Sequence, residues 1–216
     1  MRTMQTPSAK LGTLESQKGF TLIELSIVLV IIGLLVGGVI KGQELIKGSR
    51  QNNMMNAIQG YTAAVSNYQG TYRALPGDDS GAQTRWTGTG ANGNGNGLIS
   101  AAERQTFWAH MRAAGLITGA LADTTNPTNA FGGLFFISEG GGGFAATAPT
   151  LCTSRVPGDV VLRILTQYDN GQSNSGDIRV SVNPAGLTAT TAANAGAAVA
   201  TNTITADNSY AVCSRL

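Results

Sequence analysis

The sequence has few charged residues, one histidine and two cysteines, and each of these shortages excludes a class of function. Only 12% of the 216 residues are charged, and no basic cluster with interleaved aromatic residues occurs, so we expect no direct contact with nucleic acid. His110 is the only histidine, and no cysteine lies near it in the sequence. Because no Ser/His/Asp or Cys/His catalytic set can be assembled, we expect His110 to be a packing or surface residue and the protein not to be an enzyme.

The formal net charge of +2 comes from the start of the chain. Without Arg2, Lys10, Lys18 and Glu15, eleven basic and eleven acidic residues remain, so the rest of the chain is neutral. Basic side chains before and after residues 20–40 are nearly balanced, and the positive-inside rule therefore does not fix an orientation in a membrane.

Proline is absent between Phe20 and Leu75, and an apolar run fills the first part of this span. As a helix, residues 20–40 would extend about 30 Å, which matches the hydrocarbon thickness of a bilayer. Glu24 is the only ionisable residue in the run. Since a carboxylate in lipid is costly without a partner, we interpret Glu24 as a functional residue.

A second, amphipathic half of the helix is predicted beyond the apolar run. Apolar and aromatic residues recur there at steps of three and four: Met54, Ile58, Tyr61, Val65, Tyr68 and Tyr72. We expect this face to pack in a core. The helix should not continue past Leu75, because Pro76 and Gly77 follow.

The start of the apolar run carries a short motif, Lys18-Gly19-Phe20-Thr21-Leu22-Ile23-Glu24. This motif resembles the N-terminus of type IV pilins and of the pseudopilins of type II secretion, and the resemblance extends to Arg50. It implies that a prepilin peptidase cuts between Gly19 and Phe20 and that the new Phe20 amine is methylated. In the fibre of this family, Glu24 would face the Phe20 ammonium of a neighbouring subunit.

An ordinary single-pass anchor with an incidental Glu24, or a secretory signal peptide, would also contain an apolar run. The anchor gives no role to the spacing of the glutamate after Gly19 and Phe20. A signal peptide has a shorter apolar core and a small-residue cleavage site after it, whereas Lys41 and Gly42 follow here. We therefore expect the apolar segment to stay in the mature protein.

The resemblance also implies a location, partners and boundaries. The protein would be stored in a bacterial inner membrane with its C-terminus in the periplasm, and would then enter an extracellular or periplasmic fibre. Its partners would be the prepilin peptidase, an inner-membrane assembly platform, a cytoplasmic assembly ATPase, and further copies of this and related pilins. Residues 1–19 would be the leader, starting at Met1 or Met4, followed by the transmembrane half of the helix (20–40), its amphipathic half (41–75) and a globular head (76–216).

The apolar helix departs from many pilins in one respect. Where those proteins have a proline about twenty residues into the mature helix, this chain has Gly37, Gly38 and Gly42. Each glycine weakens a helix by up to about 1 kcal/mol relative to alanine. We expect this segment to bend or partly unwind in a fibre.

The two cysteines, Cys152 and Cys213, lie far beyond the apolar run. An even count in an exported domain predicts a disulfide, and two buried free thiols are the alternative. The bond would fasten the C-terminal strand, and many type IV pilins have a similar C-terminal disulfide loop.

Residues 92–103 have the oxygen spacing of an EF-hand calcium loop. The candidate ligands are Asn92, Asn94, Asn96, the carbonyl of Leu98, Ser100 and Glu103, with Gly97 at the sharp turn. Because asparagine replaces aspartate at the first three ligand positions, only weak calcium binding is expected. The preferred alternative is an Asn-Gly linker without metal, in which Ser100 and Glu103 form the capping box of a helix over residues 101–114 that stops at Gly115.

The rest of the chain predicts strands at residues 134–138, 159–168, 177–182 and 209–213, with Asn170-Gly171 as a hairpin turn. A long helix followed by antiparallel strands is an α+β pattern. The expected fold is pilin-like: a long N-terminal helix, transmembrane in its first half, packed on a small antiparallel sheet.

The expected function is that of a type IV pilin-like structural subunit, assembled into a pilus fibre for adhesion, motility or DNA uptake. A pseudopilin of a type II secretion system is the alternative, favoured by the calcium spacing and opposed by the disulfide. A membrane-anchored enzyme would leave Gly19 and Glu24 without a role. A DNA-binding minor pilin would need a basic head, and this head is close to neutral.

Overall fold

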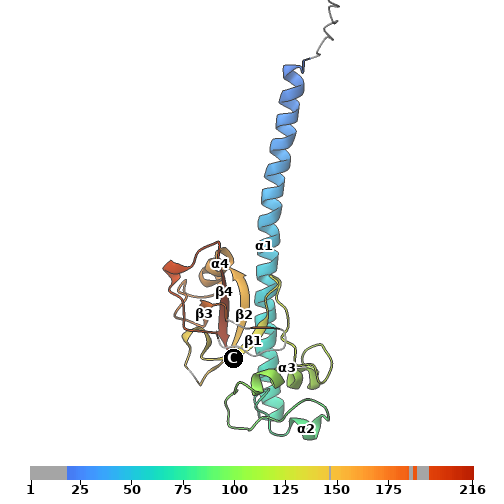
Figure 1. The fold of residues 1–216 in the computed structure, drawn as a ribbon, viewed down its shortest axis with the longest axis vertical. Coiled ribbons are helices and arrows are strands. Elements are labelled where there is room, and N and C mark those ends of the chain that lie inside the picture. The colour runs from blue at the N-terminus through green and yellow to red at the C-terminus, as the bar shows by residue number, and fades with distance from the viewer. Residues whose placement is uncertain (1–18, 146, 185–186, 189–194) are drawn as a thin grey trace, which may run out of the picture. The chain divides into compact units, whose positions relative to one another are not determined.

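The computed structural model of the protein describes residues 19–145, 147–184, 187–188 and 195–216. The chain divides into two units, Met1–Leu45 and Ile46–Leu216. Helix α1, Leu22–Tyr72, begins in the first unit and ends in the second (Figure 1). The expected leader, apart from Gly19, lies outside the described residues.

In the first unit, α1 stays helical through Gly33, Gly37, Gly38 and Gly42. A Cβ added at any of these glycines would meet nothing within 4 Å, so no close packing inside the chain requires them. The bend expected at this segment concerns the assembled fibre and stays a prediction.

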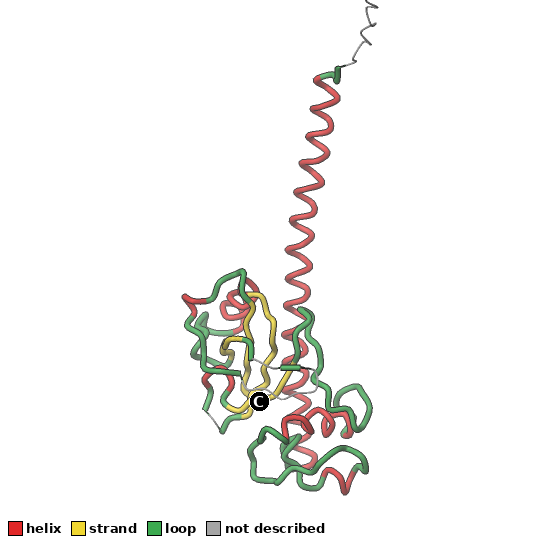
Figure 2. The backbone as a smooth tube through the Cα atoms, in the orientation of Figure 1, coloured by secondary structure: helices red, strands yellow, loops and turns green. Residues whose placement is uncertain are grey.

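The second unit contains a four-stranded antiparallel sheet in the order β1-β2-β4-β3. Its strands are drawn in yellow in Figure 2. Its strands are β1 Phe135–Glu139, β2 Pro149–Pro157, β3 Ile178–Val182 and β4 Ser209–Arg215. Among the described residues of this unit, three further α-helices occur: α2 Ala82–Arg85, α3 Glu103–Ala113 and α4 Gly158–Tyr168. A long helix followed by an antiparallel sheet confirms the predicted α+β, pilin-like class.

The predicted amphipathic face of α1 forms one side of the main core. Met54, Ile58, Val65 and Tyr68 are buried, and Tyr61 and Tyr72 are partly buried against the same cluster. The opposite side of this core comes from the sheet and from α3 and α4, with Leu151, Val212, Trp108 and Ile164 among its buried members. α1 ends at Tyr72, before Pro76, as predicted.

The prediction of a strand over residues 159–168 was wrong, because these residues form helix α4. Its buried side chains fall at one face of a helix: Val160, Val161, Ile164 and Leu165. Valine and isoleucine favour strands, but a short apolar run does not distinguish a strand from a buried helix. The hairpin expected at Asn170-Gly171 is accordingly absent, and this turn connects α4 to β3.

Strand β2 was not predicted from the sequence, although it lies inside the sheet between β1 and β4. It is bounded by Pro149 and Pro157 and contains Thr150, Thr153 and Ser154, which are buried polar residues. Threonine hydroxyls are satisfied by tertiary contacts, as where Thr150 Oγ1 donates to the Ser138 carbonyl at 2.8 Å. The prolines are tolerated because they lie at the strand ends.

The predicted disulfide joins Cys152 of β2 to Cys213 of β4, which are directly opposite in the register. Both cysteines are fully buried, and they belong to a second small core on the side of the sheet that includes Phe136 and Phe144. The backbone of Gly141 covers the bond so closely that a Cβ there would lie 2.8 Å from the Cys152 sulfur. The glycine tract before Phe144 therefore packs directly on the disulfide.

A polar cluster joins the end of α1 to the following loop. The Tyr68 hydroxyl donates to Asp79 at 2.6 Å, Arg85 pairs with the same carboxylate, and the Gly81 amide donates to it at 2.8 Å. Burial works against the charge of Asp79, but these donors outweigh it and lower its pKa. Burial, reinforced by the bond to Asp79, raises the pKa of Tyr68.

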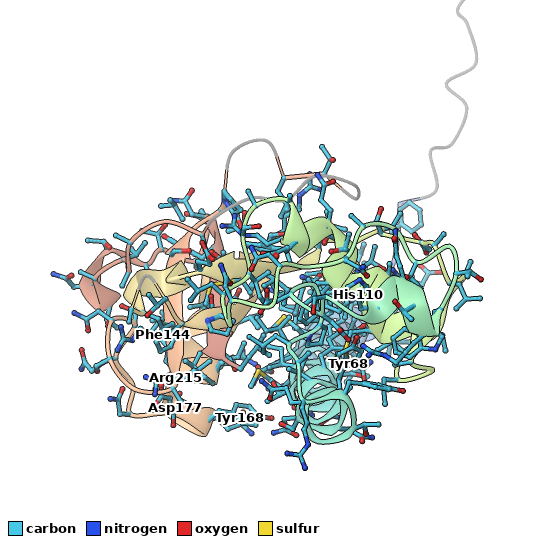
Figure 3. All side chains as sticks on the ribbon, turned by 90° about the horizontal axis from the view of Figure 1, so that it is seen from below. Tyr68, His110, Phe144, Tyr168, Asp177 and Arg215 are labelled. Carbon is cyan, nitrogen blue, oxygen red and sulfur yellow. A yellow bond between two sulfur atoms is a disulfide. The ribbon has the colours of Figure 1, made fainter. Side chains whose placement is uncertain are left out.

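His110 of α3 is fully buried and interacts electrostatically with Asp79 and Arg85 of this cluster; Figure 3 labels it on the same side of the view as Tyr68. Its Nδ1 accepts the Gly77 amide at 3.0 Å, so Nε2 carries the proton and faces the Ala91 carbonyl at 3.3 Å. The ring therefore ties together both ends of the loop between residues 77 and 91. The prediction that His110 is a packing residue is confirmed.

We expect replacement of both cysteines, Cys152→Ala with Cys213→Ala, to lower the free energy of unfolding by about 4 kcal/mol in the chain-entropy model, given their separation of 61 residues. Urea unfolding of the detergent-solubilised protein measures this loss. Reduction of the wild type with dithiothreitol in urea is the matched control and should produce a similar shift. An unchanged midpoint in both would contradict a stabilising role.

We also expect His110 to make stability fall as the pH is lowered. Burial lowers the pKa of His110 below its ordinary value near 6.5, while nearby Asp79 raises it slightly and Arg85 lowers it. The unfolded chain therefore binds a proton first, and stability is lost as the pH falls below about 6.5, by at most about 1.4 kcal/mol per pH unit.

Urea midpoints measured between about pH 7 and pH 5 test the role of His110. In His110→Gln, whose amide can keep one donor and one acceptor, the curve over this interval should be flatter than in the wild type. Parallel curves for the two proteins would show that the histidine does not cause the loss.

Candidate functional site

The first half of α1 presents apolar side chains that no described residue of its own unit covers. Between Phe20 and Leu45 every large apolar side chain is exposed, including Phe20 at 81% and Leu22 at 86%. In the part of the chain that the structure describes, α1 is the one helix long and apolar enough to cross a membrane. This surface needs either lipid or further apolar helices around it.

Glu24 lies in the first turn of this helix and is held by Thr21. The Thr21 amide and its hydroxyl both donate to Glu24 Oε2 at 2.8 Å, and the Glu24 amide donates back to Thr21 Oγ1 at 3.3 Å. This reciprocal pattern is a capping box, in which two otherwise unpaired amides of the helix start are satisfied. The Thr-x-x-Glu spacing could have revealed it in the sequence, but Thr21 was not singled out there.

The capping box places a negative charge at the N-terminal end of the helix dipole, which favours it. Both Thr21 donors bind one oxygen, Oε2, and within residues 19–45 no further chain group is seen donating to this carboxylate. Thr21 therefore fixes the direction of the Glu24 side chain without neutralising its charge. A cation supplied from outside the chain could still bind it.

Gly19 and Phe20, the predicted cleavage pair, lie just before the helix begins. Both residues are exposed and neither belongs to a helix or strand. A peptidase needs its substrate in an extended, accessible backbone, and helical residues do not offer it. This pair is exposed and lies outside the helix, whereas Leu22 and the residues after it are helical.

The candidate calcium residues lie in a loop that wraps around Asp78. This buried carboxylate accepts the amides of Gly95, Asn96 and Gly97 at 2.8, 3.1 and 2.7 Å. Gly93 fits against the Asp78 backbone so tightly that a Cβ there would overlap it. Asp78 lies 17 residues before Gly95 in the sequence, so the spacing of the loop alone does not reveal this contact.

Four of the six residues proposed as ligands accept amide hydrogens with their side-chain oxygens in the structure. Glu103 accepts the Asn94 amide at 2.9 Å and the Ser100 amide at 2.7 Å. The second bond is one half of the predicted capping box, but α3 begins at Glu103 and not at residue 101, and its N-cap residue, Ala102, makes no side-chain cap bond. Three asparagine side-chain oxygens also accept amides: Asn92 accepts that of Gln83, Asn94 that of Asn96, and Asn96 that of Leu98. Burial works against the charge of Glu103, but its bonds from Ser100 and Asn94 lower its pKa.

Among the described residues, no group of three or more His, Cys, Asp or Glu side chains is placed to hold a metal ion. The loop brings only two carboxylates, Asp78 and Glu103, close to the asparagines. Calcium binding by this loop stays a prediction. Gly115 ends α3 with a φ of 70°, as predicted, and Leu116 donates to the Met111 carbonyl at 3.1 Å.

Comparison with known proteins agrees with the arrangement at the helix start. Residues 15–40 match the family model described as the prokaryotic N-terminal methylation motif. The chain is also 32% identical over 109 residues to fimbrial protein EcpC of Eikenella corrodens, across 50% of this chain and 71% of that protein. With an exposed apolar helix, a glutamate in its first turn and an antiparallel head, the chain belongs to the type IV pilin family.

Proposed function

We propose that this subunit is cleaved between Gly19 and Phe20 by a prepilin peptidase, methylated on Phe20 and polymerised into a pilus fibre. The fibre would serve adhesion, motility or DNA uptake. The observation that supports the proposal is the exposed Gly19-Phe20 pair directly before a helix whose only ionisable residue up to Ile40 is Glu24. Assembly, not catalysis, is the proposed activity.

The assembly step uses the charge of Glu24. In lipid an unpaired carboxylate costs a few kcal/mol, and Thr21 supplies hydrogen bonds but no positive charge. Cleavage creates a new ammonium at Phe20, and in the fibre the Phe20 ammonium of one subunit pairs with Glu24 of its neighbour. Entry of a subunit is favoured in the correct register, because only that register brings the Phe20 ammonium and the Glu24 carboxylate together.

The proposed location is a bacterial inner membrane with the head in the periplasm, followed by an extracellular or periplasmic fibre. The disulfide supports export of the head, since such bonds persist in oxidising compartments. The apolar halves of α1 would form the fibre core and the heads its surface. The machinery would comprise an inner-membrane platform and a cytoplasmic ATPase, which act on the membrane-stored subunit.

A role as pseudopilin in type II secretion is the second candidate. The observation in its favour is the loop around Asp78 and Glu103, which places two carboxylates among three asparagine side chains. Such an oxygen-rich loop is suited to a weakly bound calcium ion. In this role, the short fibre would drive export of other proteins.

We expect Glu24→Gln to reduce fibre yield sharply while leaving cleavage intact. Loss of an ion pair worth more than about 1.4 kcal/mol lowers an assembly equilibrium by at least about tenfold. Sheared fibres are quantified against the membrane-bound pool, and intact mass spectrometry reports the first residue, the methyl group and the disulfide. Wild-type subunits should begin at methylated Phe20.

Ser26→Ala is the control for the Glu24 variant, because Ser26 lies in the same part of α1 and its hydroxyl donates only to the Ile23 carbonyl at 2.8 Å. This variant should assemble as the wild type does. Native protein that still begins with its leader, or full fibre yield in Glu24→Gln, would overturn the proposal.

If the loop binds calcium, millimolar calcium should raise the thermal midpoint of the protein. A ligand at ten times its dissociation constant stabilises the folded state by about 1.4 kcal/mol. Differential scanning calorimetry with calcium, and with magnesium at equal concentration as the control for ionic strength, measures the shift. Identical midpoints in both salts would remove the calcium site and with it this support for the secretion role.

A further inference from the structure

The loop around Asp78 contains three consecutive Asn-Gly pairs, at residues 92–93, 94–95 and 96–97, and a fourth pair lies at 170–171. Asn-Gly is chemically labile in neutral water. The glycine nitrogen attacks the asparagine Cγ, and a flexible glycine without a side chain offers little steric resistance. A run of three such pairs on a secreted or surface-exposed head is therefore a liability unless the structure restrains it.

In this loop, the nitrogens that would attack are all engaged as hydrogen-bond donors. The Gly93 amide donates to the Asp79 carbonyl at 3.0 Å. The Gly95 amide donates to Asp78, to its carbonyl at 2.9 Å and its Oδ1 at 2.8 Å. The Gly97 amide donates to Asp78 Oδ2 at 2.7 Å. At Gly95 and Gly97 the acceptor is the anionic Asp78 side chain, which holds the amide proton that the attacking nitrogen must lose. At Gly93 the acceptor is the neutral Asp79 carbonyl.

Exclusion of water cannot protect these asparagines from deamidation, since their side chains are not buried. Asn92, Asn94 and Asn96 all lie on the surface. The side-chain oxygens of Asn94 and Asn96 accept the amides two residues further on, at 2.9 and 2.8 Å. These bonds and those to Asp78 fix both reacting groups, and two glycines of the loop, Gly95 and Gly97, are locked at φ of 73° and 82°.

We propose that Asn94 and Asn96 form a latent deamidation site, which the Asp78 side chain keeps in the amide form by binding the nitrogens that would react. Release of the loop from Asp78 starts the modification. The proposal concerns the head alone and does not depend on fibre assembly.

The chemistry needs only water. The glycine nitrogen loses its proton and forms a bond to the asparagine Cγ, and the side-chain nitrogen leaves as ammonia. Water then opens the resulting succinimide at either carbonyl, which yields aspartate or isoaspartate. The net change is replacement of one amide by one carboxylate with release of ammonia, and no oxidant or reductant takes part.

One modification favours the next. A carboxylate formed at residue 94 or 96 lies close to the buried Asp78 carboxylate, and like charges there repel. Isoaspartate also lengthens the backbone beside Gly93, where a Cβ would already overlap Asp78. Both products weaken the loop, so the remaining glycine amides lose their acceptors. The structure thus converts a slow chemical step into a one-way release of the loop.

Peptide mapping by mass spectrometry after incubation at mildly alkaline pH tests the proposal. The detergent-solubilised wild type is compared with the same protein in urea under reducing conditions. We expect deamidation of Asn94 and Asn96 to be at least about tenfold slower in the folded protein, because reaction requires local opening. In Asp78→Ala, Asn94 and Asn96 should react at nearly the urea rate.

The fourth pair serves as a control inside each molecule. The Gly171 amide donates to the Leu165 carbonyl at 3.0 Å, on a different element from Asp78. In Asp78→Ala, Asn170 should stay as slow as in the wild type. If Asn170 also accelerates, the variant has unfolded, and Asp78→Asn takes its place, since it keeps one acceptor oxygen but loses the charge. That variant should give an intermediate rate at Asn94 and Asn96 alone.

Two results would overturn the proposal. The first is a folded wild type in which Asn94 and Asn96 deamidate as fast as in urea. The second is a folded Asp78 variant, verified by a slow Asn170, in which Asn94 and Asn96 react no faster than in the wild type.

Discussion

The constraint that governs this protein is an apolar helical surface that its own unit cannot cover. From Phe20 to Leu45 the large apolar side chains are exposed, so lipid or neighbouring helices must surround them. Apolar surface alone does not choose between these two environments, because lipid tails are as apolar as leucine. In the proposed assembly Glu24 makes the difference, because Thr21 orients its charge but does not neutralise it. Membrane storage and polymerisation are thus two solutions to one burial problem.

The head contains buried carboxylates, and backbone amides stabilise their negative charge. Asp78 and Glu103 together accept five amides of the loop and of the start of α3. Such bonds compensate the loss of water around a charge. They also explain why this loop is rich in glycine: Gly95 and Gly97 adopt positive φ, and Gly93 approaches the Asp78 backbone closely.

Local patterns in the sequence predicted the parts of the structure that depend on neighbours in the chain. The stripe from Met54 to Tyr72, the Ser100 capping interaction and the stop at Gly115 follow from spacing, and the motif around Glu24 identified the candidate assembly site. Non-local contacts decided the rest. Strand β2 has a polar sequence and lies inside the sheet only because β1 and β4 pair with it. Helix α4 consists of residues that favour strands, but its buried side chains lie on one face of a helix. Asp78 binds a loop about seventeen residues further along the chain.

The bond between Cys152 and Cys213 has a mechanical consequence. The two residues are opposite each other on adjacent strands, so the covalent link lies across the line along which β4 would peel from β2. Strands pulled apart in this direction break their hydrogen bonds one after another, which requires little force at each step. Here the stepwise breaking of hydrogen bonds between β2 and β4 stops at the disulfide. A head built in this way keeps its sheet closed under tension, and extension must be taken up elsewhere in the polypeptide.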